Sequence, residues 1–230
     1  MSVIFVAGTD TGVGKSVVTG LLAGYLADRG NAVVTQKWVE TGSVGSSADI
    51  AVHNRFMGKN RPHPVASLSL MAPYVFRFPA SPHLAAGMEG KHILIDKIKN
   101  SVRKLSEDFK YVVAEGTGGL LVPLNQKTLM VDIVKDLKLP VLVVAINRLG
   151  AINQVLLSIE ALKSRGIEIL GVVFNNMPKG NTEDMVLKDN PKIVRKLSGV
   201  NVLGSLPYEK NIRRLRVKFA PIGDRIIGRL

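Results

Sequence analysis

Residues Gly8 to Ser16 read Gly-Thr-Asp-Thr-Gly-Val-Gly-Lys-Ser, a combination suited to binding phosphate. Glycine permits the turns that point successive amides inward, and a helix that starts at such a loop adds its unpaired N–H groups. Lys15 can then reach the terminal phosphates, and the Ser16 hydroxyl can ligate magnesium. An apolar run precedes the loop and a helical pattern follows it. We therefore interpret the loop as ATP-binding rather than as a glycine-rich turn that binds nothing.

The spacing within this loop departs from the general pattern, which is glycine, any four residues, then Gly-Lys-Ser/Thr. Here Thr9 takes the first position, and the glycine stands one residue earlier, at Gly8. Partition and cell-division ATPases carry a signature lysine at the position where this chain has Asp10. That difference argues against an ATPase of that regulatory kind.

Two acidic residues are candidates for holding a metal. The apolar run from Tyr111 to Ala114 predicts a buried strand, Glu115 ends it, and Gly-Thr-Gly-Gly follows. In proteins with a phosphate-binding loop, a carboxylate at such a strand end lies near the magnesium, and we predict this for Glu115. Asp49 opens a predicted helix, either as a structural first-turn acid or as a second magnesium ligand, and its spacing leaves both readings open.

Further polar groups follow predicted strands. Lys37 follows a predicted strand, and parallel strands end at one crevice, so its ammonium could neutralise a transferring phosphoryl group. It could equally be a surface lysine, and both interpretations remain open. Asn175 and Asn176 end another strand, where an amide can read a purine edge or form a turn. The helix start at residues 150–153 offers amides to an anion, although an ordinary helix start is the commoner case.

The elements that must position these groups alternate between strands and helices. Strands are expected at 3–7, 32–36, 111–114, 139–146, 167–174 and 200–206, and helices at 15–28, 49–57, 95–105, 152–165 and 192–197. The alternation predicts right-handed crossovers and an α/β single-domain P-loop NTPase fold over residues 1–230, with a mostly parallel central sheet and helices on both faces. We interpret the less regular residues 43–90 as an excursion near the site.

The composition narrows the class of protein. A chain of 230 residues with 46% hydrophobic residues can bury one α/β core, and the lack of cysteine excludes disulfide, cysteine–zinc and cysteine-nucleophile chemistry. With no signal-like N-terminus and no apolar run near 18 residues, we expect a cytoplasmic protein without a membrane span. The net charge is +13, but the basic residues are spread out, so we expect anionic small-molecule ligands rather than nucleic acid. The one dense basic cluster, Lys210 to Lys218, is either a solvated tail or an anion patch.

Other side chains carry less information. The four histidines have no metal-ligand spacing, and most are expected at the surface or as caps. Trp38 and the methionines are expected to pack in the core.

The sequence resembles the dethiobiotin synthetases along nearly its whole length. The marks are Gly8 to Ser16, Lys37 with Thr41-Gly42, Ser81-Pro82-His83, Glu115 to Gly119 leading to Pro123, Leu149 to Asn153, and Asn175-Asn176. The resemblance implies that ATP, CO2 and 7,8-diaminononanoate give dethiobiotin, ADP and phosphate. One amine forms a carbamate, which attacks the γ-phosphate and gives a mixed carbamic-phosphoric anhydride. The other amine closes the ureido ring and expels phosphate.

The resemblance also implies residue roles and a homodimer. Lys15 and Lys37 are the expected catalytic cations, and Ser16, Asp49 and Glu115 the expected Mg2+ ligands. The remaining ATP contacts are expected from Gly12, Val13, Gly14, Val17, Gly116, Thr117, Gly118, Asn175, Asn176, Leu206, Pro207 and Tyr208, with Asn175 reading adenine. Thr11, Thr41 and Gly118 are expected to contact the diamine near the subunit interface, where Gly150, Ala151, Ile152 and Asn153 of the neighbouring subunit receive its carboxylate.

Three departures from the family pattern bear on these roles. Trp38 replaces a usual proline and Glu40 a usually uncharged neighbour of Thr41, and either change can alter substrate fit beside Lys37. The arginine-rich segment from Ile212 to Leu230 matches the family poorly, which leaves nucleotide preference open. The alternative functions are another ATP-dependent ligase that forms an acyl phosphate, and a non-enzymatic nucleotide switch.

Overall fold

The computed structural model describes residues 2–58, 66–178 and 183–230, so His63 and part of the proline-rich excursion lie outside the described residues. Within these ranges the chain alternates strands and helices in the following order: β1 (Ser2–Gly8), α1 (Lys15–Ala27), β2 (Val33–Lys37), β3 (Val39–Thr41), α2 (Ala48–Met57), α3 (Leu68–Met71), β4 (Tyr74–Phe76), α4 (Pro82–Met88), α5 (Ile95–Asp108), β5 (Tyr111–Gly119), α6 (Met130–Asp136), β6 (Val141–Asn147), α7 (Ala151–Lys163), β7 (Ile169–Asn176), α8 (Asp184–Ser198), β8 (Val202–Leu206) and α9 (Ile212–Ile227).

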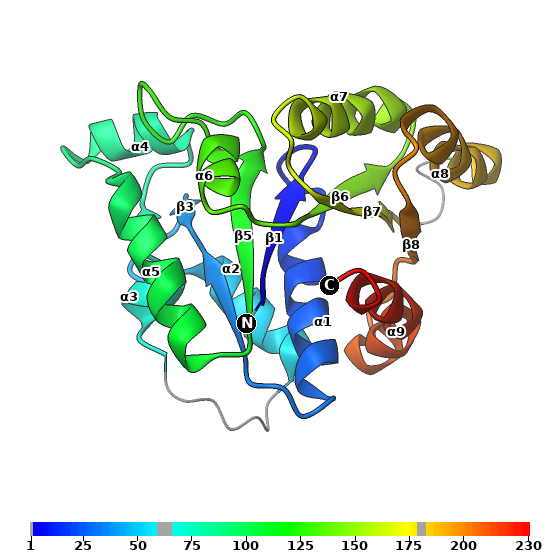
Figure 1. Ribbon diagram of the computed structural model, residues 1–230, viewed down its shortest axis with the longest axis horizontal. Helices are drawn as coiled ribbons and strands as arrows, with labels where there is room; N and C mark the ends of the chain where they lie inside the picture. The colour runs from blue at the N-terminus through cyan, green and yellow to red at the C-terminus, as the bar shows by residue number, and fades with distance from the viewer. Residues whose placement is uncertain (1, 59–65, 179–182) are drawn as a thin grey trace.

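The central sheet has six strands in the order β2-β5-β1-β6-β7-β8, and every neighbouring pair is parallel (Figure 1). Alternate side chains of β1 point to opposite faces, with Phe5 and Ala7 in one core layer and Ile4 and Val6 in the other. Because both faces are covered, the central strands are mostly apolar, as is typical of a buried parallel sheet. The sequence prediction of a parallel α/β sheet is confirmed.

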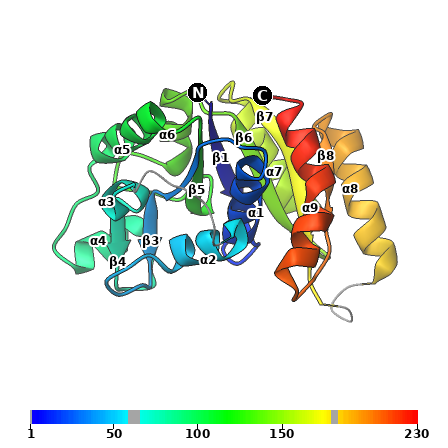
Figure 2. The same cartoon turned by 90° about the horizontal axis from the view of Figure 1, so that it is seen from below.

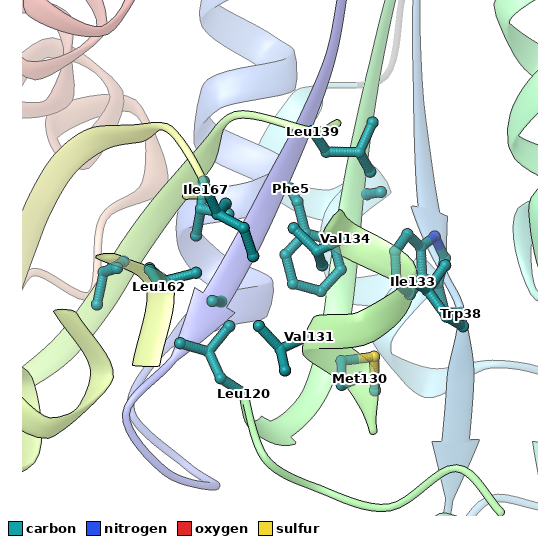
Figure 3. Close-up of a cluster of buried hydrophobic side chains, with 14 of the residues drawn as sticks. Phe5, Trp38, Leu120, Met130, Val131, Ile133, Val134, Leu139, Leu162 and Ile167 are labelled. Atoms are coloured by element: carbon teal, nitrogen blue, oxygen red, sulfur yellow. The ribbon is translucent and has the colours of Figure 1, made fainter. Parts of the chain in front are cut away.

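Helices cover both faces of this sheet (Figures 1 and 2). α1 and α9 pack on one face, while α5, α6 and α7 contribute to the core on the other. Figure 3 shows part of this second core, where Phe5 of β1 lies near Trp38 and the α6 side chains. The rings of Phe5 and Trp38 are 4.5 Å apart between centroids, so Trp38 is a core residue, as predicted.

Helices α1 and α2 approach each other through glycine. A Cβ on Gly20 would lie 2.7 Å from the carbonyl oxygen of His53, and one on Gly24 would lie 3.1 Å from the Cα of Met57. The first distance is shorter than real Cβ atoms show and the second is tighter than most real contacts, so the two glycines allow the helix backbones to pack together. This contact fixes α2, which carries Asp49, relative to α1, which carries Ser16.

The C-terminal segment is a helix that the sequence analysis did not predict. α9 buries Leu215, Phe219, Ile222 and Ile226 against the α1 side of the sheet, while Arg213, Arg214 and Lys218 are exposed. Within the basic cluster, Arg216 forms an ion pair with Asp28 of the α1 C-cap. The cluster is therefore one face of a packed amphipathic helix, not a solvated tail.

Apart from α2, which was expected at 49–57, the short elements between residues 39 and 88 were also absent from the prediction. β3 and β4 pair with each other as a separate parallel ribbon, and α3 and α4 flank it. In the described parts of the chain, no helix is long and apolar enough to cross a membrane.

Candidate active site

The phosphate loop connects β1 to α1, and two of its glycines have backbone angles that side chains disfavour. Gly12 and Gly14 have φ values of 74° and 95°. A Cβ on Gly14 would also lie 2.1 Å from Nδ2 of Asn175, which donates to the carbonyl of Val13 at 3.1 Å. Only glycine fits this position, because both its φ and its surroundings exclude a side chain.

The displaced glycine of the motif has a structural reason. The Lys15 side chain folds back over Gly8, and its Nζ donates to the carbonyl of Asp10 at 2.7 Å. A Cβ on Gly8 would lie 2.7 Å from that Nζ. Glycine at position 8 therefore leaves room for the lysine, and Asp10 contributes its backbone rather than its carboxylate to this contact.

Four side chains from four elements meet beside the loop. Ser16 Oγ of α1 lies 2.8 Å from Asp49 Oδ1 of α2 and 3.0 Å from Glu115 Oε1 of β5. Lys37 Nζ, at the end of β2, lies 2.7 Å from Asp49 Oδ2 and 2.7 Å from Glu115 Oε1, and it also donates to the Gly116 carbonyl. The structure thus brings together Lys37 and the three residues expected to hold Mg2+, and Lys37 is not a surface lysine.

The charges of this cluster set one another's ionisation. Burial would raise the pKa of the Glu115 carboxyl, but the Lys37 ammonium and the hydrogen bond with His53 lower it to about 2. Burial would lower the pKa of Lys37, yet Glu115 and Asp49 outweigh burial and raise it. Burial, together with repulsion from Lys37, lowers the pKa of Lys15 to about 8. At neutral pH, Glu115 is therefore an anion and both lysines are mainly cations.

His53 belongs to the same cluster, although the sequence analysis did not identify it. Its side chain is fully buried, and its Nε2 lies 2.5 Å from Glu115 Oε2. His53 is therefore an exception to the expectation that most histidines lie at the surface or act as caps. A signal was present, because His53 follows Asp49 by one helical turn and so shares its face of α2.

Glu40 stabilises the start of α2, the helix that carries Asp49. Its buried carboxylate accepts hydrogen bonds from the Ala48 amide at 2.8 Å, from Ser43 Oγ at 2.5 Å and from Ser47 Oγ. It thereby places negative charge at the N-terminus of α2, where the helix dipole favours it. The family departure at this position thus stabilises the helix that carries Asp49.

Lys15, Lys37 and the three expected Mg2+ ligands line one cavity of about 780 Å³. Thr11 and Gly118, Thr41 of β3 and the Ser81–Pro82 start of α4 all face it. The excursion after β2 therefore supplies one wall of the site. Thr117 faces the cavity as well, and its hydroxyl donates to the Val39 carbonyl. The described lining residues are Thr11, Gly12, Gly14, Lys15, Ser16, Val17, Lys37, Glu40, Thr41, Asp49, Val52, Pro79, Ala80, Ser81, Pro82, Glu115, Thr117, Gly118 and Val122.

The residues expected near adenine lie at the neighbouring strand ends. Asn175 of β7 pairs in register with Leu206 of β8, and Pro207 and the half-exposed Tyr208 follow directly. The Asn176 side chain instead accepts a hydrogen bond from Asn147 Nδ2 at 2.9 Å. None of these residues lines the cavity that holds the lysines.

The expected carboxylate site stands apart from that cavity within the chain. Gly150, with φ 86°, caps the N-terminus of α7, and Ala151, Ile152 and Asn153 form its first turn. Leu149 just before it is 83% exposed. Residues 150–153 do not line the cavity that contains Lys37 in the same protomer.

The donor set at Ser16, Asp49 and Glu115 fits magnesium. All three side chains offer hard oxygen atoms, and magnesium is usually held by one or two carboxylates together with substrate phosphates. Among the described residues, no group of three or more His, Cys, Asp or Glu side chains could hold a metal ion unaided. A site completed by nucleotide phosphate matches this arrangement.

Known proteins resemble the chain in both sequence and structure. A family model described as an AAA domain matches residues 2–216. The ATP-dependent dethiobiotin synthetase BioD of Chlorobaculum tepidum is 46% identical over 174 residues, which cover 75% of this chain and 72% of that protein. The ATP-dependent dethiobiotin synthetase BioD 2 of Haemophilus influenzae is 38% identical over 192 residues, 84% of this chain and 98% of that protein.

Among solved structures, the MinD cell division protein of Aquifex aeolicus superimposes with a TM-score of 0.58 at 14% identity, covering 99% of this chain and 98% of that one. This likeness concerns the fold alone, and it agrees with the predicted α/β fold. The sequence identities to the two synthetases show the family, because they extend over most of each relative and agree with the resemblance found in the sequence. The chain therefore belongs to the ATP-dependent dethiobiotin synthetase family.

Proposed function

We propose that this chain converts 7,8-diaminononanoate, CO2 and ATP into dethiobiotin, ADP and phosphate in a Mg2+-dependent reaction. One observation carries the proposal beyond the family name. The Lys37 ammonium, two carboxylates and the Ser16 hydroxyl converge beside a phosphate loop, in a cavity that Thr11 and Thr41 also line. A cationic centre between a phosphate cradle and hydroxyl groups suits phosphorylation of a small anion.

The chemistry needs positive charge where a carbamate oxygen meets the γ-phosphorus. An amine of the substrate adds to CO2 and gives the carbamate, and the carbamate oxygen then attacks the γ-phosphorus while ADP leaves. Lys37 and Lys15 neutralise the charge that develops between the two anions. Both side chains line the same cavity, and both are mainly protonated at neutral pH.

Ring closure takes place in the same cavity and depends on how the diamine is oriented. The other amine attacks the carbonyl carbon of the anhydride, and phosphate leaves with the oxygen that came from the carbamate. The hydroxyls of Thr11 and Thr41 and the Gly118 backbone orient the diamine for this step. Ser16, Asp49 and Glu115 would hold magnesium, which supplies charge neutralisation of the β- and γ-phosphates when bound.

The nucleotide base and the substrate tail extend the site on either side. Asn175 contacts the phosphate loop through the Val13 carbonyl and pairs in register with Leu206 near the end of β7, which supports its role at adenine. In a homodimer, the N-terminus of α7, beginning at Gly150, would receive the substrate carboxylate from the neighbouring subunit. The amides and positive helix end at that position support this role.

The test is incubation with Mg-ATP, bicarbonate and 7,8-diaminononanoate, with nucleotide followed by chromatography and product by mass spectrometry. A synthetase releases one ADP per dethiobiotin and little ADP without the diamine. A nucleotide switch would hydrolyse ATP slowly and independently of the diamine. A ligase of another substrate would bind ATP but give no dethiobiotin, and either result would reject the proposal.

A further inference from the structure

His53 is a buried ionisable residue for which the proposed reaction gives no role. It lies on α2 one turn after Asp49, and its side chain has no solvent exposure. Its Nε2 is 2.5 Å from Glu115 Oε2, while its Nδ1 has no hydrogen-bond partner among the described residues. A buried Nδ1–H without an acceptor would be costly, so the arrangement favours the tautomer that carries its proton on Nε2.

The contact divides the two oxygen atoms of Glu115 between two tasks. Oε2 accepts the hydrogen bond from His53. Oε1 lies 2.7 Å from Lys37 Nζ and 3.0 Å from Ser16 Oγ, on the side of the cavity. A carboxylate held at one oxygen by a fixed donor presents its other oxygen in a fixed direction.

The backbone around His53 is itself held in place. Its carbonyl oxygen packs where a Cβ on Gly20 would otherwise lie, so α2 cannot shift there without opening the contact with α1. An apolar side chain could fill the space of the imidazole ring. It would leave Oε2 of the fully buried Glu115 carboxylate without a hydrogen-bond donor. The Glu115 side chain would then have to rotate to find another donor.

We propose that His53 is a positioning residue, whose Nε2–H holds Glu115 so that Oε1 faces Ser16 and the metal of the nucleotide complex. The inference rests on the proposed function, in which Glu115 is a metal ligand. His53 does not touch substrate or metal and acts through Glu115 alone. The loss of its donor should therefore weaken metal binding more than it alters the fold.

Three variants test this role with Mn2+ as the metal probe. Free Mn2+ is measured by electron paramagnetic resonance during titration of protein and ATP, without diamine. His53→Leu removes the donor at similar volume, whereas His53→Gln keeps an N–H the same number of bonds from Cα. Glu115→Gln removes the proposed ligand charge. Thermal unfolding without metal shows whether each variant is folded.

The expected loss of Mn2+ affinity is about 10- to 100-fold for His53→Leu, with His53→Gln within about threefold of the parent protein. Affinity unchanged in His53→Leu, or lost equally in both His53 variants, would overturn the inference. If Glu115→Gln loses affinity while His53→Leu does not, only the role of His53 fails. If Glu115→Gln binds Mn2+ like the parent, the metal assignment fails and the inference falls with it.

A second measurement reads the protonation of His53 directly in the parent protein and needs only the conservative His53→Gln variant for assignment. In 15N-histidine spectra of the folded protein, the ring of His53 should show a proton on Nε2. Its resonance is assigned by its absence from the His53→Gln spectrum. An Nε2 without a proton would leave no donor for Glu115 and would overturn the inference.

Discussion

Replacement of Lys37 by methionine removes the ammonium that joins Asp49 to Glu115 and keeps a side chain of similar length. In the parent protein, Lys37 Nζ contacts both carboxylates at 2.7 Å and the Gly116 carbonyl at 3.0 Å. The Lys37 side chain is only 4% exposed, so water cannot replace these contacts. The variant should therefore lose both stability and turnover.

The structure sets the size of each loss. Removal of one partner from a buried ion pair costs about 3–5 kcal/mol. Glu115 keeps its contacts with His53 and Ser16, so we expect the lower end, about 3 kcal/mol. For a chain of this length, that corresponds to a fall in melting temperature of roughly 6–12 °C. Turnover should fall about 100- to 1,000-fold, the usual effect of losing one group that stabilises transition-state charge.

The pH dependence gives a signature of the same pair. The pKa of Glu115 is lowered from 4.5 to about 2, so the stability that its pairing provides is complete above about pH 4.5 and is lost as pH falls toward 2. The stability difference between the parent and Lys37→Met should therefore be constant from pH 8 to pH 6. It should shrink on acidification below pH 4.5.

The assays are urea unfolding without ligand and steady-state formation of dethiobiotin. Lys99→Met is the matched control, because Lys99 pairs with Asp136 on the surface at the same 2.7 Å separation. That exposed pair should contribute about 1 kcal/mol or less. Equal effects of the two variants on stability, or turnover of Lys37→Met within about tenfold of the parent, would refute the reasoning.

Three further predictions concern the supports of the site. Gly20→Ala should destabilise the protein by about 1–3 kcal/mol in urea unfolding, because its Cβ would lie 2.7 Å from the His53 carbonyl oxygen. The control Gly87→Ala, in a helical position with open space, should stabilise it by up to about 1 kcal/mol, and a stabilised Gly20→Ala would contradict the packing argument. Glu40→Gln should cost about 1–3 kcal/mol, since it weakens the hydrogen bonds at the start of α2, and an unchanged melting temperature would exclude this capping role. ATP affinity, measured by calorimetry, should fall as pH rises through about 8, because burial lowers the pKa of Lys15 and its ammonium form binds phosphate; an unchanged affinity up to pH 9.5 would argue against that role.

Much of the site could be predicted from single strands. Lys37, Glu115 and Asn175 each end an apolar run, and parallel strands end at one edge of a sheet, so the pattern predicted this edge for all three. It left open whether Lys37 faces a phosphoryl group or lies on the surface. The phosphate loop carried its own signal in its glycines and in Lys15. These predictions needed no knowledge of how helices pack.

The remaining features depend on packing between elements that lie far apart in the sequence. Spacing could not show that Asp49 lies beside Ser16, because this depends on the close contact of α1 with α2 through Gly20. The place of His53 in the site becomes evident only from its contact with Glu115 in the folded chain. α9 was hidden because Pro221 and the many arginines obscured an apolar stripe that packs against α1.

The most direct test of the account uses bicarbonate labelled with 13C and 18O in a short reaction with Mg-ATP and 7,8-diaminononanoate. Because the carbamate oxygen attacks the γ-phosphorus and leaves with phosphate, dethiobiotin should carry 13C while the released phosphate carries 18O. One ADP should form for each dethiobiotin. A folded protein that binds ATP but gives no labelled dethiobiotin, or labelled dethiobiotin with phosphate free of 18O, would contradict carbamate phosphorylation at this site.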